Sequence, residues 1–394
     1  MQRGIRSGWA LPAGGVPAMG AMLTRDRAAQ SVRDGVRMLP LVGAPVLPMP
    51  EHVRRAVAEA MNLPDRRDSR GLPELRAAIA AELERDNGLQ VDPERRVLIT
   101  HGAMHGLSLV LRTVLAPGDE VIVPTPTFFF DGLLREAGAR PVYVGSHERD
   151  GWALDVASLE AAVTPHTRAV LLCNPNNPTG NLPDAATIAA VVDMAGRHGL
   201  VVISDDSWQH FTFDGRQYQP VESFAGRWPH LITVTSLSKY YALATWRVGY
   251  VVAPPSIVDA LERRLQWEAV CCGAVPQHAA VAALTGPRDW LDGALSTYQA
   301  KRDLVCDGIA ATGLTPPVRP EAGAFLLLDC ARLGATPADI DRALLSNGIA
   351  AVRGADMHAP DTHVRLTFGS DVEVLRNLLR ALTRAVQDTT RPHP

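Results

Sequence analysis

Lysine is nearly absent from this sequence of 394 residues. Of its 39 basic residues only Lys239 and Lys301 are lysines, so the chain uses arginine almost everywhere for a fixed positive charge. Arginine cannot lose its proton near neutral pH, whereas lysine can. Lys239 ends the run Ser236-Leu-Ser-Lys239, which directly follows the apolar stretch Leu231–Thr235. A lysine that can deprotonate there suits Schiff-base chemistry with an aldehyde cofactor, although two lysines alone fit surface positions equally well.

Other absences exclude whole classes of protein. The five cysteines form no C-x-x-C pair, and only Cys271 and Cys272 are adjacent, which argues against a disulfide framework or a zinc site and favours a reducing, cytoplasmic compartment. No stretch approaches the ~20 apolar residues of a membrane span. The net charge is only −3 and no dense basic run occurs, so nothing indicates a nucleic acid or an anionic membrane as a partner.

The N-terminus faintly resembles a signal peptide, with two arginines ahead of the apolar segment Trp9–Leu23. Prolines and glycines interrupt that segment and disfavour a helical apolar core. The sequence therefore predicts a loose N-terminal arm.

From Pro50 onward, helix-like and strand-like segments alternate. The runs rich in β-branched residues are 97–100, 121–123, 142–144, 169–173, 200–204, 231–235 and 248–252. This alternation predicts an α/β fold with a mainly parallel, seven-stranded sheet between layers of helices. After about Pro287 a long amphipathic stretch leads into short strands, which predicts a smaller α+β domain. We expect an N-terminal arm and part of the small domain at 1–49, a large cofactor-binding domain at 50–287 and a small C-terminal domain at 288–394.

Candidate ligand-binding residues lie where predicted strands end. In an open α/β sheet, ligands bind beyond the carboxyl ends of the strands. Gly102-Ala103-Met104 follows the first strand and opens a helix, whose free amides can cradle a phosphate. Taken alone, this run is more typical of a structural turn.

Two further motifs follow central strands. The run Asn174-Pro-Asn-Asn-Pro-Thr-Gly180 forms a rigid loop in which Asn177 can present its amide to a ligand oxygen, unless it is only a well-made turn. Asp205 comes at a strand end, where a buried carboxylate requires a cationic or donor partner such as a pyridinium nitrogen. Its neighbour Asp206 fits a surface turn or a helix cap better.

Two serines and two arginines are further candidate ligand-binding residues. Ser236, Ser238 and Arg247 flank Lys239 and can hold a phosphate through hydroxyls and a guanidinium fork. Arg365 alternates with apolar residues in a late strand, where it can clamp a carboxylate or simply lie at a sheet edge.

In this order and spacing, the motifs resemble the aspartate-aminotransferase-like class I/II family of fold type I pyridoxal phosphate enzymes. The resemblance runs from about Val42 to the C-terminal helix. Further likenesses are Gly43-Ala-Pro45, Gly71-Leu-Pro-Glu-Leu-Arg76, Pro117-Gly-Asp-Glu-Val121 and Gly323-Ala-Phe325.

The resemblance implies a role for each candidate. Lys239 would form the Schiff base with pyridoxal 5'-phosphate and move the proton, while Asp205 would pair with the ring nitrogen and make the ring an electron sink. The implied cofactor contacts are Gly102, Ala103, Met104, Ser236, Ser238 and Arg247 at the phosphate, Phe128 stacked on the ring, and Asn177 with Trp208 near the 3-oxygen. The implied substrate contacts are Gly43, Asn177 and Arg365, the last holding the α-carboxylate.

The resemblance also implies an activity: an amino group passes between an amino acid and a 2-oxo acid, in a homodimer with shared active sites. A lyase, cyclase, decarboxylase or oxidase on the same fold is the alternative. A cofactor-binding regulator fused to a DNA-binding module is disfavoured, because only about 40 residues precede the matched region and they contain no helix-turn-helix.

Three departures from the family pattern point to a specialised substrate. Trp208 replaces the usual tyrosine, and its indole can donate a hydrogen bond but cannot ionise in its place. No tyrosine precedes Val142, so the stretch around Arg66 lacks the usual contact to the partner's phosphate. The usual Pro-Gly turn reads Arg353-Gly354, followed by Asp356 and His358. We expect Glu268 or Asp356 to contact a basic substrate.

Overall fold

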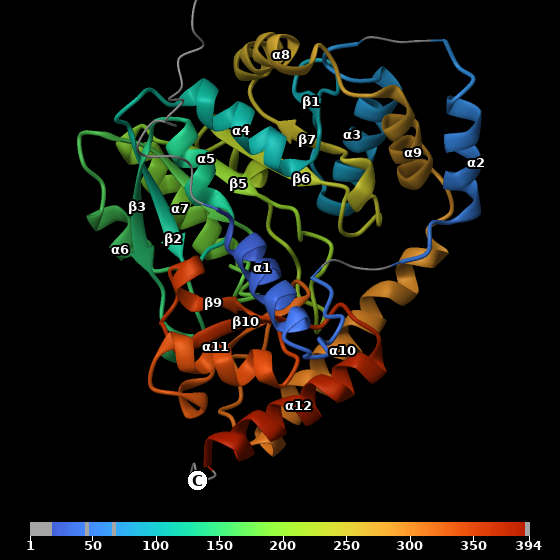
Figure 1. Cartoon of the computed structure of the whole chain (residues 1–394). Coiled ribbons are helices and arrows are strands. Elements are labelled where there is room, and N and C mark those ends of the chain that lie inside the picture. The colour runs from blue at the N-terminus through green and yellow to red at the C-terminus, as the bar shows by residue number, and fades with distance from the viewer. Residues whose placement is uncertain (1–17, 44–46, 65–67, 391–394) are drawn as a thin grey trace, which may run out of the picture.

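The computed structural model describes residues 18–43, 47–64 and 68–390. Its larger part is built on a seven-stranded sheet with the strand order β1-β7-β6-β5-β4-β2-β3 (Figure 1). The strands are β1 (Val97–Thr100), β2 (Glu120–Thr125), β3 (Arg140–Gly145), β4 (Thr167–Cys173), β5 (Val201–Asp205), β6 (Leu231–Ser236) and β7 (Gly249–Val252). Strands β2 to β6 pair in parallel, and only β7 runs antiparallel to its neighbours β1 and β6. The predicted mainly parallel sheet is confirmed.

Helices cover both faces of this sheet. They are α2 (Glu51–Ala60), α3 (Pro73–Asn87), α4 (Ala103–Val114), α5 (Phe130–Glu136), α6 (Val156–Ala161), α7 (Ala185–His198), α8 (Pro255–Ala269) and α9 (Ala274–Thr285). Successive residues of a strand point to opposite faces. Accordingly, Leu171 and Ile203 join the core under α3, α4, α8 and α9, whereas Val170, Leu172 and Val202 join the core under α6 and α7. Burial on both faces explains the continuous apolar runs of the sequence.

The smaller part contains a three-stranded antiparallel sheet with the order β8-β10-β9. Its elements are α10 (Asp289–Thr312), β8 (Phe325–Asp329), α11 (Pro337–Ser346), β9 (Val352–Arg353), β10 (His363–Thr367) and α12 (Val372–Thr390). Trp208, Phe211 and Phe213, which follow β5 of the large sheet, also pack into this core. The two parts therefore meet at the end of β5. The division at 49/50 and 287/288 stays a proposal, which this separation of cores supports.

The N-terminal segment corrects one expectation. Residues 1–17 lie outside the described part, but Gly20–Arg33 form helix α1, where we expected a loose arm to continue through Leu23. Helix α1 is fixed to the smaller part, because Thr24 Oγ1 donates to the carbonyl of Ala351 at 3.3 Å and Arg27 Nε lies 3.2 Å from Asp341. No helix in the described ranges has the length and apolar character needed to cross a membrane.

Candidate active site

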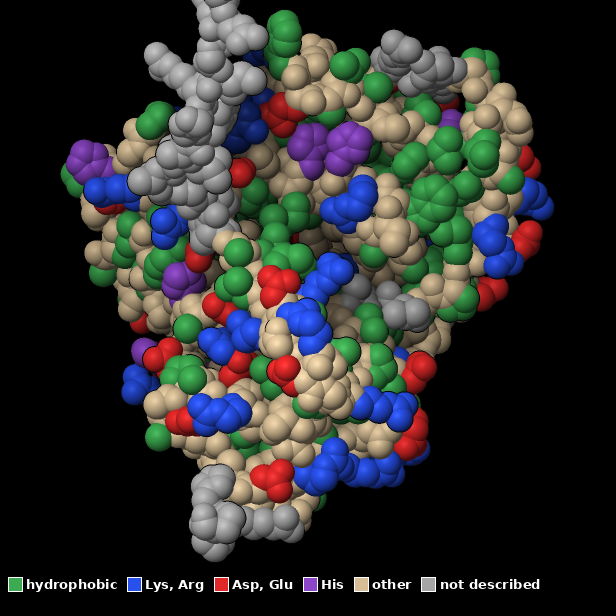
Figure 2. Space-filling view, viewed as in Figure 1, with side chains coloured by type: hydrophobic (Ala, Val, Ile, Leu, Met, Phe, Trp, Pro, Cys, Tyr) green, Lys and Arg blue, Asp and Glu red, His purple; other side chains and the backbone are tan. Residues whose placement is uncertain are grey.

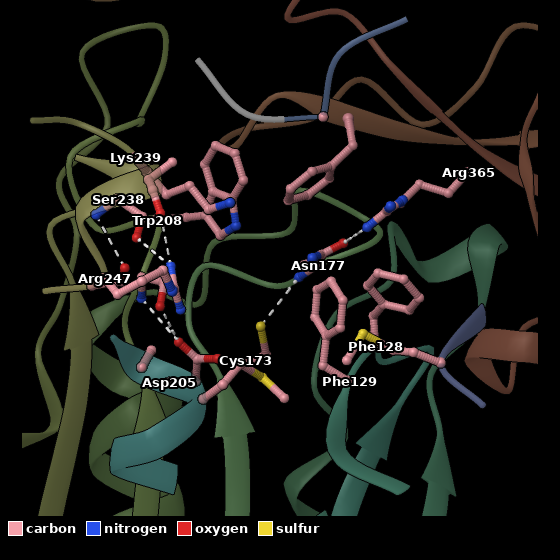
Figure 3. Close-up of a pocket in the computed structure, with 18 residues that line it drawn as sticks. Phe128, Phe129, Cys173, Asn177, Asp205, Trp208, Ser238, Lys239, Arg247 and Arg365 are labelled. Atoms are coloured by element: carbon pink, nitrogen blue, oxygen red, sulfur yellow. Dashed lines mark hydrogen bonds between the residues drawn. The ribbon is translucent and has the colours of Figure 1, made fainter. Parts of the chain in front are cut away.

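A cavity of about 320 Å³ opens at the carboxyl ends of β4, β5 and β6, between the two parts of the chain (Figure 3). Every residue predicted for the site lines it except Gly102, which lies behind Arg247. The lining residues among those predicted are Gly43, Ala103, Met104, Phe128, Asn177, Asp205, Trp208, Ser236, Ser238, Lys239, Arg247 and Arg365. In the close-up, Lys239 and Trp208 lie on one side, and Phe128, Asn177 and Arg365 lie on the other. The fold thus brings together side chains spread over more than 300 positions.

Lys239 follows β6, in a turn that holds its amine inside the cavity. Burial lowers the pKa of Lys239 to about 8, and the charges of Arg365 and Arg247 act in the same direction, against the opposing effect of Asp205. Its Nζ lies 5.0 Å from the ring centroid of Trp208. An amine with a pKa near 8 is partly neutral at physiological pH, as a nucleophile toward an aldehyde must be. The other lysine, Lys301, is buried in α10, where its Nζ donates to the carbonyl of Gly369 at 3.2 Å.

Asp205 ends β5 and lies beside Cys173 in the parallel register. Burial raises the pKa of Asp205, while hydrogen bonds from the Ser207 hydroxyl (2.6 Å) and amide (3.1 Å) partly oppose the rise. Among the described residues no arginine or lysine forms an ion pair with this carboxylate. A buried acceptor without a cationic partner fits a protonated ring nitrogen.

Asp206 is a correction to the sequence analysis. We expected a surface turn or a helix cap, but its side chain is fully buried. It accepts hydrogen bonds from the hydroxyls of Ser204 and Tyr218. Burial raises the pKa of Asp206 to about 7, and the nearby charge of Asp205 contributes. Asp206 therefore does not line the cavity, and its hydrogen bonds with Ser204 and Tyr218 lie in the protein interior next to it.

The start of α4 forms an anion cradle. Gly102 caps the helix with a φ of 79°, and a Cβ at this position would lie 2.5 Å from Arg247 Nη2, so only glycine fits. Arg247 Nη1 lies 3.3 Å from Ser238 Oγ. At Gly249 a Cβ would lie 2.9 Å from the amide nitrogen of Ala103, so this glycine lets β7 approach the helix start. Helix amides, hydroxyls and a guanidinium converge as a phosphate group requires.

Arg365 projects from β10 across the cavity. Its Nη1 donates to Asn177 Oδ1 at 3.0 Å, and its Cζ lies 4.1 Å from the ring centroid of Phe128. Burial lowers the pKa of Arg365 to about 10, so the side chain stays protonated at neutral pH. Its Nε is buried without a hydrogen-bond partner in the described part of the chain. Such a guanidinium can bind a carboxylate.

The cavity also contains residues that the sequence analysis missed. They are Met19, Phe129, Cys173, Ser207, Ala244 and Phe325. The spacing Asp205-x-Ser207 was a usable signal, since an aspartate often binds the backbone two residues later. Met19 gave none, because only the folded chain brings the residue before α1 to the same cavity as Met104 and Phe128.

The residues that depart from the family pattern lie in different parts of the structure. Trp208 packs edge-on against Phe325, with ring centroids 5.0 Å apart, at the cavity wall. Arg353 pairs with Asp341 and does not line the cavity. Of the two acidic residues expected to contact a basic substrate, Glu268 lies outside the cavity within one chain, 3.0 Å from Arg112, so its role stays a prediction. Arg66 lies outside the described residues.

Comparisons with known proteins agree with this site. Residues 42–382 match the family model of aminotransferase class I and II. The chain is 31% identical to a probable aspartate/prephenate aminotransferase of Thermus aquaticus, over 92% of this chain and 94% of that protein. It is 28% identical to aromatic-amino-acid aminotransferase 2 of Thermococcus litoralis, covering 88% and 91%. A solved structure of a Thermus thermophilus aspartate aminotransferase variant complexed with tryptophan superposes with a TM-score of 0.90 at 30% identity, covering 96% and 99%.

The chain therefore belongs to the class I and II aminotransferase family. It is an aminotransferase of pyridoxal phosphate fold type I, as the sequence motifs predicted.

Proposed function

We propose that this aminotransferase binds pyridoxal 5'-phosphate in the cavity described above, with the amine of Lys239 attached covalently to the aldehyde carbon of the cofactor. The observation that carries the proposal is the amine of Lys239, which lines the cavity together with Asp205, Arg365 and Arg247 and whose pKa burial lowers to about 8. The anion cradle at Gly102 fits the phosphate of this cofactor. The carboxylate of Asp205, which has no ion-pair partner among the described residues, fits its ring nitrogen.

The bound cofactor would supply an electron sink for the substrate carbanion. The protein's own groups set its position. Asp205 would hold the ring nitrogen protonated, and Asn177 and Trp208 would donate toward the 3-oxygen. Phe128 would cover a ring face, and Ser236, Ser238 and Arg247 would hold the phosphate together with the amides that open α4.

Lys239 and Arg365 act on the substrate. Arg365 would bind the α-carboxylate, together with Asn177 and the backbone at Gly43, and so would fix which bond at Cα is broken. The amine of Lys239 would take the proton from the substrate Cα and return it. The same residues would serve the reverse reaction, in which a 2-oxo acid receives the amino group.

Product analysis tests the reaction type. With an amino acid and a 2-oxo acid present, we expect equal amounts of new 2-oxo acid and new amino acid, with no ammonia released. Turnover that releases ammonia or carbon dioxide and needs no 2-oxo acid would instead support the elimination or decarboxylation alternative.

Cofactor capture by the apoprotein should depend on pH in one direction. The pKa of Lys239 is lowered from its ordinary value to about 8, so the neutral amine becomes dominant above pH 8 and scarce below it. We expect the rate of covalent capture, followed by absorbance, to rise about tenfold per pH unit below 8 and to level off above it. A capture rate that falls between pH 7 and 9 would contradict this assignment.

We further propose a homodimer in a reducing, cytoplasmic compartment. Trp267 and Val270, at the end of α8, are 94% and 60% exposed, which suits a surface that a second copy covers. All five cysteines are free. Sedimentation at twice the chain mass would support the dimer, and a monomer at micromolar concentration would contradict it.

A further inference from the structure

A second cavity of about 550 Å³ adjoins the first and has no assigned role. The two cavities share four residues, Met19, Met104, Phe128 and Phe129, so they meet across the aromatic pair at the start of α5. The rings of Phe128 and Phe129 lie 3.7 Å apart. The face of the molecule in Figure 2 is visibly hollowed between the two parts of the chain. A side chain that leaves the substrate Cα near Lys239 can therefore continue past these rings.

Part of the wall of the second cavity is apolar. Besides the shared residues, Leu23 of α1 and Phe130 and Leu133 of α5 contribute to it. Phe129 has a φ of 81°, in the left-handed region that a bulky residue rarely adopts. The surrounding structure holds this conformation, which places the ring between the two cavities. The apolar part of the wall suits an extended aliphatic chain.

Charge is distributed unevenly around the cavity. Three carboxylates line it, those of Asp131, Glu136 and Asp356, together with His358. No lysine or arginine is among its lining residues, all of which belong to the described chain. Carboxylates therefore outnumber basic side chains among the described lining residues here, whereas Lys239, Arg247 and Arg365 line the first cavity.

Asp131 stays ionised in this setting. Burial raises the pKa of Asp131, but hydrogen bonds from His358 Nε2, at 3.1 Å, and from the hydroxyl of Tyr143 outweigh this effect and hold the pKa below its usual value. The rings of Tyr143 and His358 stack with centroids 3.8 Å apart, so both donors are fixed.

Asp356 has a cation only at the limit of ion-pair distance. Its Oδ2 is buried and accepts no hydrogen bond from the described residues, and the nearest cation among them, Arg27 Nη2, is 4.0 Å away. Arg27 is already engaged by Asp341, with its Nε at 3.2 Å. A Cβ at Gly20 would lie 2.7 Å from the Cβ of Asp356, so α1 packs closely against this residue and fixes it. Asp356 lines the cavity, so a ligand cation there would lie beside this carboxylate, whose neighbour Arg27 also pairs with Asp341.

We propose that the second cavity is the side-chain subsite of the amino donor and that it takes a basic amino acid, with an aliphatic stem that ends in a guanidinium or an ammonium group. This inference rests on the proposed function of the first cavity. The α-carboxylate lies at Arg365, the stem runs past Phe128 and Phe129, and the cation lies among Asp131, Glu136 and Asp356. A carboxylate side chain would meet like charges there.

Binding of unreactive substrate analogues to the holoenzyme tests the proposal. The analogues are ω-guanidinopentanoate, heptanoate and adipate, which share a carboxylate for Arg365 and differ at the far end in bearing a cation, no charge or an anion. By calorimetry we expect the guanidino compound to bind about tenfold or more tightly than heptanoate, and adipate to bind weakest. Heptanoate or adipate binding as tightly as the guanidino compound would overturn the proposal.

Variants locate the effect. Asp356→Asn should abolish most of the preference for the guanidino compound while leaving the affinity for heptanoate unchanged. Asp131→Asn provides a second variant should the first fail to fold. Asp150→Asn, which neutralises an exposed carboxylate outside both cavities, should keep the wild-type preference. A preference that survives in both cavity variants would contradict the subsite.

The result also separates the two proposals. If Lys239 carries the cofactor but the analogues bind equally well, only the basic-donor subsite fails. If Lys239 carries no cofactor, the proposed function fails whatever the analogues do.

Discussion

Replacing Lys239 with alanine should lower amino transfer by at least about 10³-fold, because the variant loses both the covalent attachment point and the group that moves the proton at Cα. The fold should survive, since the change removes a partly desolvated charge from a cavity wall. Steady-state turnover with a basic and an aromatic donor, alongside the far-ultraviolet circular dichroism spectrum, measures both.

The matched control uses the only other lysine. Lys301→Arg keeps the charge and a donor for the carbonyl of Gly369, and it lies outside the cavity. Turnover should stay within a few-fold of wild type. Wild-type turnover in Lys239→Ala, or an equal loss in both variants, would contradict the role given to Lys239.

Replacing Asp205 with asparagine should have the second largest effect. The change keeps the shape and the contact with Ser207 but removes the charge that holds the ring nitrogen protonated. We expect turnover to fall by about 10²- to 10³-fold, the usual loss when one preorganised electrostatic group is removed. Cofactor should still bind through the phosphate cradle, so its absorbance remains measurable in the variant.

The neighbouring carboxylate provides the control. Asp206 is fully buried and contacts Ser204 and Tyr218, whereas Asp205 lines the cavity. Burial raises the pKa of Asp206 to about 7. Asp206→Asn should therefore cost less than about tenfold in turnover. Equal losses at the two positions would mean that burial of a carboxylate matters here, and not its contact with the cofactor.

The sheet could be predicted from the sequence because its strands are short, β-branched and buried on both faces. Val170 and Leu172 face one core, while Leu171 faces the other. The run is therefore apolar throughout, which is typical of a parallel strand buried on both faces. Since parallel strands end at one edge, the residues after β4, β5 and β6 were predictably neighbours.

What could not be predicted depends on packing between distant segments. The contacts of α1 with Ala351 and Asp341 join residues more than 300 positions apart, and no local pattern encodes them. The burial of Asp206 depends on Tyr218, which approaches it from a loop. The second cavity likewise arises only where α1, α5 and the segment at Asp356 come together.

The amine of Lys239 is the centre of this account, and reductive labelling tests it most directly. The protein would be saturated with pyridoxal phosphate, treated with borohydride, digested and mapped by mass spectrometry. We predict a stable pyridoxyl adduct on the peptide that contains Lys239 and none on the peptide that contains Lys301. An unmodified Lys239 in a cofactor-saturated sample would contradict the account.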